Sequence, residues 1–235
     1  MPNKVLPETL RNFIDGHVEN VSGGSDPLYS DDAVKHLTRL TRSSETRAGL
    51  ILQRSIVEGL RRGAEYTVLT PRAFPVCAEP KQQLFAHDID FVLGALHLPV
   101  TKAVSTTEID LIAIRHRDRS AAVYEIRRAN GRLGWKATRD ALLKLASAKM
   151  LLRDWILREC GIVVDNTAAY LVAYFGNLDD VQAVFPPQMV LTRDNLDQHF
   201  GLPVRELVDA ANELYGRHVD QAVAKVVKSM KEGRK

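Results

Sequence analysis

Residues 108–114 read Glu-Ile-Asp-Leu-Ile-Ala-Ile, and residues 121–127 read Ala-Ala-Val-Tyr-Glu-Ile-Arg. The six residues between these two segments, 115–120, read Arg-His-Arg-Asp-Arg-Ser. Runs rich in apolar, β-branched and aromatic residues that flank a short polar segment are typical of a β-hairpin. The sequence therefore predicts two neighbouring antiparallel strands near the middle of the chain.

Segments with helical and strand patterns alternate on both sides of this hairpin. Before the hairpin, the sequence predicts a helix over residues 44–62, capped at Ser43 or Ser44 and ended by Gly63, and then a strand over residues 66–69. After the hairpin, it predicts a long helix over residues 135–159, ended by Gly161, and a strand buried on both faces over residues 168–175. Residues 71–80 predict a proline-broken connection, and residues 84–97 fit either a helix or a buried strand. This order predicts an α/β fold with a mixed central sheet flanked by helices on both faces.

Further helices are expected at both ends of the chain. Apolar residues recur at helical spacing before residues 20–27, where Gly, Ser, Asp and Pro cluster as in a linker. After the core, one helix is expected to start at Pro203 and a last helix to begin near Val219. The sequence thus predicts three parts, namely an N-terminal helical arm and linker over 1–40, an α/β core over 41–200 and a C-terminal helical extension over 201–235.

The composition argues against several classes of protein. Of 235 residues, 45% are apolar and 26% are charged, which is typical of globular domains and unlike disordered or collagen-like chains. The two cysteines form no Cys-x-x-Cys pair, and the seven histidines show no metal-ligand spacing and are interpreted as surface or loop residues. No long apolar stretch or secretory signal is visible, so we expect a cytoplasmic protein without membrane contact.

Two carboxylates lie in the apolar centres of the predicted strands. Because side chains alternate between the two faces of a strand, Asp110 shares a face with Ile112. By the same alternation, Glu125 shares a face with Arg127. A carboxylate among apolar residues is costly unless it is paired or bound to a metal. If the hairpin brings both acids to one face, their oxygens suit Mg²⁺ or Mn²⁺, which activates water and neutralises charge on a phosphate.

These residues and the order of elements resemble the PD-(D/E)XK nuclease superfamily, over about residues 44–176. In this resemblance Asp110 matches the family's Asp, Glu125 matches the Glu of its Glu-x-Lys motif, and Glu58 matches the acid that many members carry on the first helix. The resemblance implies a restriction-endonuclease-like core that hydrolyses DNA with Mg²⁺ or Mn²⁺. Asp110 and Glu125 would then hold the metal, and Glu58 would orient a metal-bound water.

Arg127 stands where the family has Lys, since residues 125–127 read Glu-Ile-Arg. Arginine keeps the positive charge and can stabilise a phosphate in the transition state, but it does not act as a base. Arg127 is therefore expected to be a catalytic residue together with Asp110, Glu125 and Glu58. Because relatives sometimes relocate the motif lysine, a lysine from the following helix is a second source of the ammonium group; the candidates are Lys136 and Lys144.

Basic residues are concentrated beside these acids. From Arg115 to Arg158 the chain has twelve Lys and Arg against four Asp and Glu, whereas the net charge of the whole chain is only +3. Such a concentration predicts binding to a phosphate backbone. The residues expected to bind nucleic acid are Arg128, Arg132, Lys136, Arg139 and Lys144. Trp135 can stack on a base or pack at the start of its helix, and core packing is the favoured interpretation.

Structural readings of the same residues remain open. Asp110 can form an internal ion pair with Arg127, Glu125 can pair with Arg127 or Arg128, and Glu58 can be solvated or salt-bridged. The leading hypothesis is metal-dependent hydrolysis of DNA, and the alternative is a catalytically impaired nuclease-fold module that binds DNA or a protein partner without cutting. A third hypothesis is an interaction protein that forms a homodimer through its C-terminal helices.

Overall fold

The computed structural model describes residues 6–19, 32–94, 96–128, 134–175, 181 and 183–232. The chain divides into two compact units, one built from Met1–Gly59 with Pro203–Lys235 and the other from Leu60–Leu202. This division differs from the three predicted parts, because residues 41–59 group with the two ends of the chain and not with the sheet.

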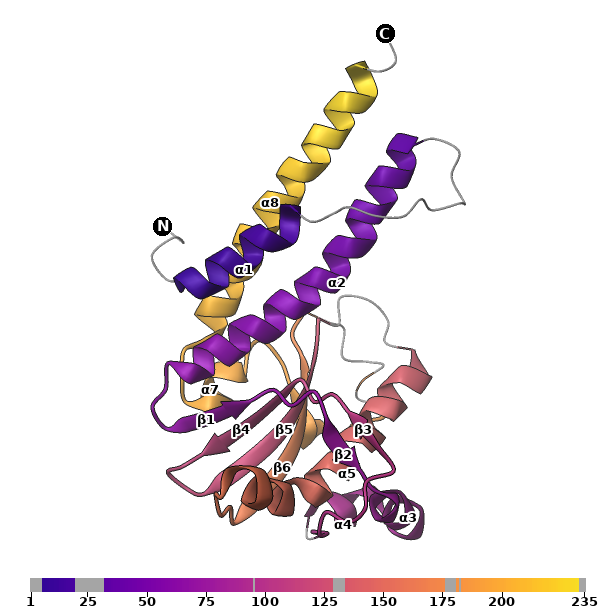
Figure 1. The fold of residues 1–235 in the computed structure, drawn as a ribbon, viewed down its shortest axis with the longest axis vertical. Coiled ribbons are helices and arrows are strands. Elements are labelled where there is room, and N and C mark those ends of the chain that lie inside the picture. Colours follow the sequence, from indigo (N-terminus) through magenta and orange to yellow (C-terminus); the bar gives the residue numbers. More distant parts are fainter. Residues whose placement is uncertain are drawn as a thin grey trace. The chain divides into compact units, whose positions relative to one another are not determined.

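A five-stranded mixed sheet forms the centre of the Leu60–Leu202 unit (Figure 1). Its strands, in spatial order, are β1 (Tyr66–Leu69), β4 (Leu111–Arg115), β5 (Ser120–Arg127), β6 (Asn166–Ala173) and β7 (Val190–Leu191). The pairs β1–β4 and β4–β5 are antiparallel, whereas β5–β6 and β6–β7 are parallel. Parallel neighbours need a long crossover, and α5 (Trp135–Cys160) provides it between β5 and β6. The predicted hairpin, the strand before it and the buried strand after it are confirmed.

Helices pack on both faces of this sheet, as the sequence predicts. On one face, side chains of α5 such as Leu145 and Leu152 share a buried core with Val123 of β5. On the opposite face, Tyr124 contacts the rings of His199 and Phe200 from the short helix α7 (Leu196–Phe200). The unit is therefore mixed α/β, with β5 covered on both sides.

β4 begins three residues later than the strand predicted over residues 108–114. The backbone N–H of Ile126 on the neighbouring strand donates a hydrogen bond to Oδ2 of Asp110 at 2.7 Å. The Asp110 side chain thus supplies the acceptor that a backbone carbonyl would supply in a continuing ladder. β4 therefore begins directly after the residue whose carboxylate turns toward β5.

The connection from β1 to β4 contains more regular structure than the sequence predicts. Its elements are β2 (Phe74–Val76), α3 (Ala78–Ala86), α4 (Ile89–Gly94) and β3 (Ser105–Thr107), with β2 antiparallel to β3. The prediction of a broken connection over residues 71–80 is therefore wrong. Pro80 is tolerated because it lies in the first turn of α3, where a backbone amide has no helical partner. Residues 84–97 fit either a helix or a buried strand by their sequence, and the structure has the helix α4 within this range.

Gly161 ends α5, as predicted. Its φ of 66° lies in the left-handed region, and its N–H donates to the carbonyl of Leu157 at 3.1 Å. Glycine adopts this conformation without the steric penalty that a Cβ would bring. After β6, the short 3-10 helix η2 (Pro187–Met189) leads directly into β7.

The other unit is helical in the residues that the structure describes. Its helices are α1 (Glu8–Glu19), α2 (Asp32–Arg61) and α8 (Val204–Glu232), and their buried side chains include Leu10, Ile14, Ile51 and Leu207. The predicted start of α2 is wrong, because the Ser44 hydroxyl bonds to the Thr41 carbonyl inside the helix and does not cap it. The two predicted C-terminal helices are a single helix, α8.

Candidate acidic and basic site

Asp110 and Glu125 face each other on the side of the sheet that α5 covers. In the β4–β5 pair, Leu111 lies opposite Tyr124, so one further step places Asp110 opposite Glu125. Glu125 alternates with Tyr124 and therefore points to the opposite face from that ring. The condition set by the sequence, that the hairpin brings both acids to one face, is met.

The pKa of Asp110 is raised from 3.8 to about 6. Burial is the largest cause, because it penalises the charged form, and the negative charge of Glu125 adds to it. The hydrogen bond from Ile126 and the cations of Lys144 and Arg127 oppose the rise without cancelling it. Asp110 is thus an acid that the fold holds partly buried beside a second acid.

Glu125 is the most buried charged group of this cluster, with 4% of its side chain exposed. Its Oε1 accepts a hydrogen bond from the guanidinium of Arg127 at 2.5 Å, and its Oε2 accepts one from the Lys144 ammonium at 2.6 Å. A buried carboxylate of this kind is tolerated because each oxygen has a charged partner. The ion pair expected between Glu125 and Arg127 under the structural reading is therefore present.

Of the two lysines named as candidates, the structure brings Lys144 to the acids. Lys144 lies on α5 with 26% of its side chain exposed, and its ammonium reaches Glu125 from the helix. Lys136 is exposed in the first turn of α5. Arg127, at the position of the motif lysine, has half of its side chain exposed to solvent.

Glu58 lies at the end of α2, in the other unit from Asp110 and Glu125. Its Oε1 forms an ion pair with the guanidinium of Arg54 at 3.1 Å, one helical turn earlier. The salt-bridged reading of Glu58 is therefore present, and its expected role in orienting a water stays a prediction.

Asp110 and Glu125 are the carboxylates of this cluster that would hold Mg²⁺ or Mn²⁺, and both Glu125 oxygens accept hydrogen bonds from Arg127 and Lys144. Mg²⁺ is commonly held by one or two carboxylates, with waters and substrate phosphates completing its coordination. Burial and, second, the charge of Glu125 raise the pKa of Asp110, and a bound cation would favour its charged form. Within the described ranges, no group of three or more His, Cys, Asp or Glu is arranged to hold a metal. The residues therefore do not form a closed structural metal site.

The basic residues near the acids have diverse environments. Lys136 and Arg139 are exposed on α5, and the guanidinium of Arg128 lies 5.2 Å from the centre of the Phe175 ring. Arg132 lies outside the described residues. Several other cations are neutralised locally, since ion pairs join Arg115 to Asp118, Arg119 to Asp165 and Arg158 to Asp154. Asp118 and Asp154 are already among the four acids counted over residues 115–158, so of these pairs only Arg119–Asp165 lowers the positive excess counted from the sequence.

Lys149 is not a surface cation, although the sequence counts it with the others. Its side chain is fully buried, and its ammonium donates to the carbonyls of Val92, Gly94 and Leu96 at 3.3–3.4 Å. Burial lowers the pKa of this ammonium. These hydrogen bonds connect α5 to the end of α4 and the residues after it, so Lys149 has a structural role.

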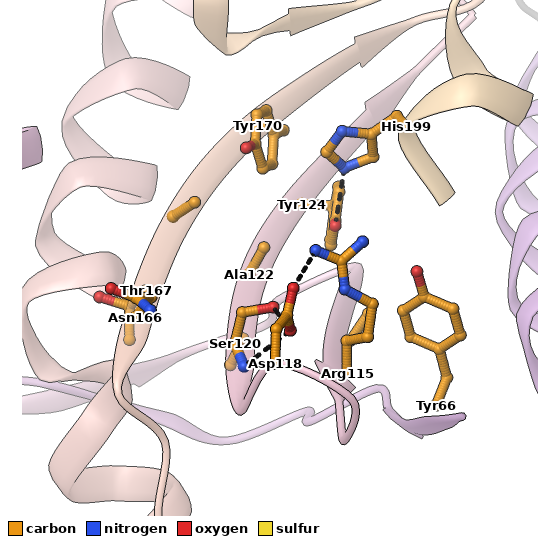
Figure 2. A pocket seen from close by; sticks show the side chains of 13 residues that line it. Tyr66, Arg115, Asp118, Ser120, Ala122, Tyr124, Asn166, Thr167, Tyr170 and His199 are labelled. Atoms are coloured by element: carbon orange, nitrogen blue, oxygen red, sulfur yellow. Dashed lines mark hydrogen bonds and ion pairs between the residues drawn. The ribbon is translucent and has the colours of Figure 1, made fainter. Parts of the chain in front are cut away.

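A cavity of about 370 Å³ lies on the opposite face of the same sheet (Figure 2). Its walls include the rings of Tyr66, Tyr124, Tyr170 and His199, and the Arg115–Asp118 ion pair lies at one side. No sequence pattern described above predicts this cavity. The alternation of Tyr124 with Glu125 was the available signal, because it places an aromatic ring on the face of the sheet opposite Glu125.

The polar groups of this cavity are largely paired with each other or with the backbone. The hydroxyl of Tyr124 lies 3.0 Å from Nε2 of His199, and the hydroxyl of Tyr66 donates to the carbonyl of Phe200 at 2.8 Å. Burial lowers the pKa of His199 to about 4, so its ring is neutral at pH 7. The interpretation of every histidine as a surface or loop residue is therefore wrong for His199, which packs within an aromatic cluster of α7 and the sheet.

No protein-family model matches this chain, and no significant similarity to a curated protein or a solved structure was found. None of the helices in the described residues is long and apolar enough to cross a membrane.

Proposed function

We propose that this protein hydrolyses phosphodiester bonds in DNA with the help of Mg²⁺ or Mn²⁺. The observation that carries the proposal is the contact between Lys144 and Glu125 beside Asp110. A buried acid, Glu125, a partly buried acid, Asp110, and an ammonium group meet at one place, and the ammonium comes from the helix that follows the second strand. This arrangement supports a restriction-endonuclease-like core in which Lys144 takes the part of the motif lysine.

Each group has a defined task in this proposal. Asp110 and Glu125 hold the divalent cation, which supplies charge neutralisation and lowers the pKa of a water molecule. Lys144 stabilises negative charge that develops on the phosphate oxygens, since it lies in a partly buried position where electrostatic interactions are strong. Arg127 is half exposed, so it can turn from Glu125 toward a phosphate without crossing the core.

The reaction is the addition of water to a phosphodiester. The water oxygen bonds to phosphorus, one phosphorus–oxygen ester bond breaks, and the departing oxygen takes up a proton. The products are a phosphate monoester and a hydroxyl group. The candidate site provides cations where negative charge increases during the reaction. The reaction requires no side chain that forms a covalent intermediate.

The experiment is incubation of supercoiled plasmid with the purified protein in Mn²⁺ or Mg²⁺. We expect nicking that is lost in EDTA and in Glu125→Gln, a variant that keeps the size of the side chain. Glu159→Gln is the matched control, because Glu159 is exposed near the end of α5 and away from the buried acids. Nicking that survives unchanged in Glu125→Gln and in Asp110→Asn would contradict the proposal.

A second candidate function is DNA binding without hydrolysis. Two observations favour it, namely the arginine at the motif lysine position and the occupation of both Glu125 oxygens by cations. In that case the plasmid would shift on a native gel and stay uncut with or without a divalent cation. Binding would then depend on Arg128, Lys136 and Arg139 more than on the acids.

A further inference from the structure

A groove of about 860 Å³ lies beside Lys144 in the Leu60–Leu202 unit. Residues of β2, α3, β3 and α5 form its walls. Lys144 lines this groove and also donates to Glu125, so the groove begins where the proposed reaction takes place. The volume is within the range of sites that hold a small molecule or part of a larger one.

The walls of the groove expose large apolar side chains. Phe85 of α3 is 80% exposed, and Val104 and Leu143 are also exposed along the same depression. Single exposed apolar residues are common, but several that line one concave surface mark a binding site. The occupant of the groove therefore has apolar or aromatic faces.

The charged side chains among the described residues of the groove have one sign. Lys81, Arg139 and Lys144 line it, and the described residues that form its walls include no Asp or Glu. Such a lining is complementary to a ligand that carries several negative charges. The occupant thus combines flat or apolar groups with a repeated negative charge.

Trp135 extends this surface along α5. Residues 135, 139, 143 and 147 follow one another at intervals of four, which places them on one side of a helix. The last three line the groove, and Trp135 is 61% exposed one turn before Arg139. Core packing of Trp135, the interpretation favoured by the sequence, is therefore wrong. The exposed ring continues the aromatic and basic surface instead.

We infer that the groove binds an unpaired strand of nucleic acid, so that the proposed hydrolysis acts on single-stranded or frayed DNA in preference to an intact duplex. The bases stack on Phe85 and Trp135, and the phosphates contact Lys81, Arg139 and Lys144. In a duplex the faces of the bases are covered by their neighbours, whereas an unpaired base offers a face to an aromatic side chain. This inference rests on the proposed function, since it names the substrate class of the same site.

The test compares a fluorescein-labelled oligothymidine with a labelled DNA hairpin of the same number of phosphates, by fluorescence anisotropy in EDTA. We expect the full chain to bind the single strand about tenfold more tightly than the hairpin. In Phe85→Ala/Trp135→Ala, affinity for the single strand falls by about tenfold or more, and affinity for the hairpin changes less than about twofold. Phe91→Ala is the matched control, because Phe91 is exposed on α4 and does not line the groove.

Equal affinity for the two DNA forms, or an unchanged affinity of Phe85→Ala/Trp135→Ala for oligothymidine, would overturn the inference. A groove that binds an acidic amphipathic peptide and leaves oligothymidine unbound would overturn it as well. The plasmid assay separates this failure from failure of the proposed function. Metal-dependent nicking without single-strand binding refutes only the groove, and single-strand binding that requires Phe85 and Trp135 without any hydrolysis refutes only the catalysis.

Discussion

Tyr124 and Glu125 are neighbours on β5, and they face opposite sides of the same sheet. On the side of Tyr124, hydroxyl and imidazole groups are held in a neutral network with His199. On the side of Glu125, a buried carboxylate lies beside a second acid and is held by two cations. One strand thus presents a cluster of neutral hydroxyl and imidazole groups on one face, next to the Arg115–Asp118 ion pair, and two carboxylates with two cations on the other.

The difference shows which face is built for packing and which is not. A neutral network loses little when it is removed from water, because its donors and acceptors satisfy one another. A carboxylate whose pKa is raised by burial lowers the stability of the fold at neutral pH, and carboxylates of this kind are common at functional sites. The charged face is therefore the better candidate for chemistry.

The largest expected effect is on hydrolysis, and it separates the two faces. Under the proposed function, Glu125→Gln should lower the rate of plasmid nicking by about a thousandfold or more, because the proposed cation would lose one of its two ligands and the charge at the phosphate would no longer be balanced. Tyr124→Phe, one residue away, should leave the rate within about twofold, since its hydroxyl points to the opposite face. Rates are measured under single-turnover conditions. Equal losses in both variants would mean that the effect is one of folding.

Lys144→Met should have the next largest effect, on stability. The change leaves the buried Glu125 carboxylate with only the half-exposed Arg127, and breaking a buried pair in this way costs about 3 kcal/mol. The free energy of unfolding is measured by urea titration. Lys136→Met, on an exposed part of the same helix, should change it by less than about 0.5 kcal/mol.

A double variant tests the cause of that loss. In Glu125→Gln/Lys144→Met the buried charge is absent, so the double variant should be more stable than Lys144→Met alone. Additive losses would show that Lys144 stabilises the fold through packing of its stem and not through the ion pair.

Much of the fold was predictable because apolar runs and turn residues are clear in this chain. The apolar and aromatic run in β5, the continuous apolar run in β6 and the glycine at the end of α5 each predict an element that the structure contains. The wrong predictions of element boundaries lie where a single side chain overrides the local pattern of the sequence. Asp110 delays the start of a strand because its side chain accepts the Ile126 amide, and Pro80 occupies the first turn of a helix instead of breaking one.

The candidate site was predictable only in part. Strand alternation allowed Asp110 and Glu125 to share one face only if the hairpin register brought them together, and the structure supplies that register. The choice of Lys144 over Lys136 depends on how α5 crosses the sheet. The burial of Lys149 and of His199 depends on contacts with residues far along the chain, namely with the end of α4 and with the rings of β5 and β6. A single sequence carries no local signal of such contacts.

Asp110→Asn should stabilise the protein at neutral pH. The Asp110 carboxyl loses its proton near pH 3.8 when unfolded and near pH 6 when folded, so wild-type stability falls as pH rises through this interval. Asparagine does not ionise, and its side-chain oxygen can still accept the Ile126 amide. In EDTA the variant should gain at most about 3 kcal/mol over wild type above about pH 7 and nothing near pH 3.5. Urea titrations across this range measure the gain, and a gain of the same size at every pH would contradict its electrostatic cause.

The smallest expected effect lies on the neutral face. Tyr124→Phe removes the hydrogen bond to His199, which should cost about 1 kcal/mol of the free energy of unfolding at neutral pH.

The stability contributed by His199 changes with pH in the opposite direction to that contributed by Asp110. His199 takes up a proton near pH 6.5 when unfolded and only near pH 4 when folded, so the stability it contributes is complete above about pH 6.5 and is lost as pH falls toward 4.

This acid-side loss should persist in Tyr124→Phe and disappear in His199→Gln, because burial and not the hydroxyl is the largest cause of the lowered pKa. Combining Tyr124→Phe or His199→Gln with Asp110→Asn removes the pH dependence of stability that Asp110 contributes. The pH dependence that remains then reports the His199 side of the sheet. An Asp110→Asn protein whose stability does not fall between about pH 6.5 and pH 4 would show that the His199 ring is open to water. The two faces of β5 would then no longer differ in how they hold their polar groups.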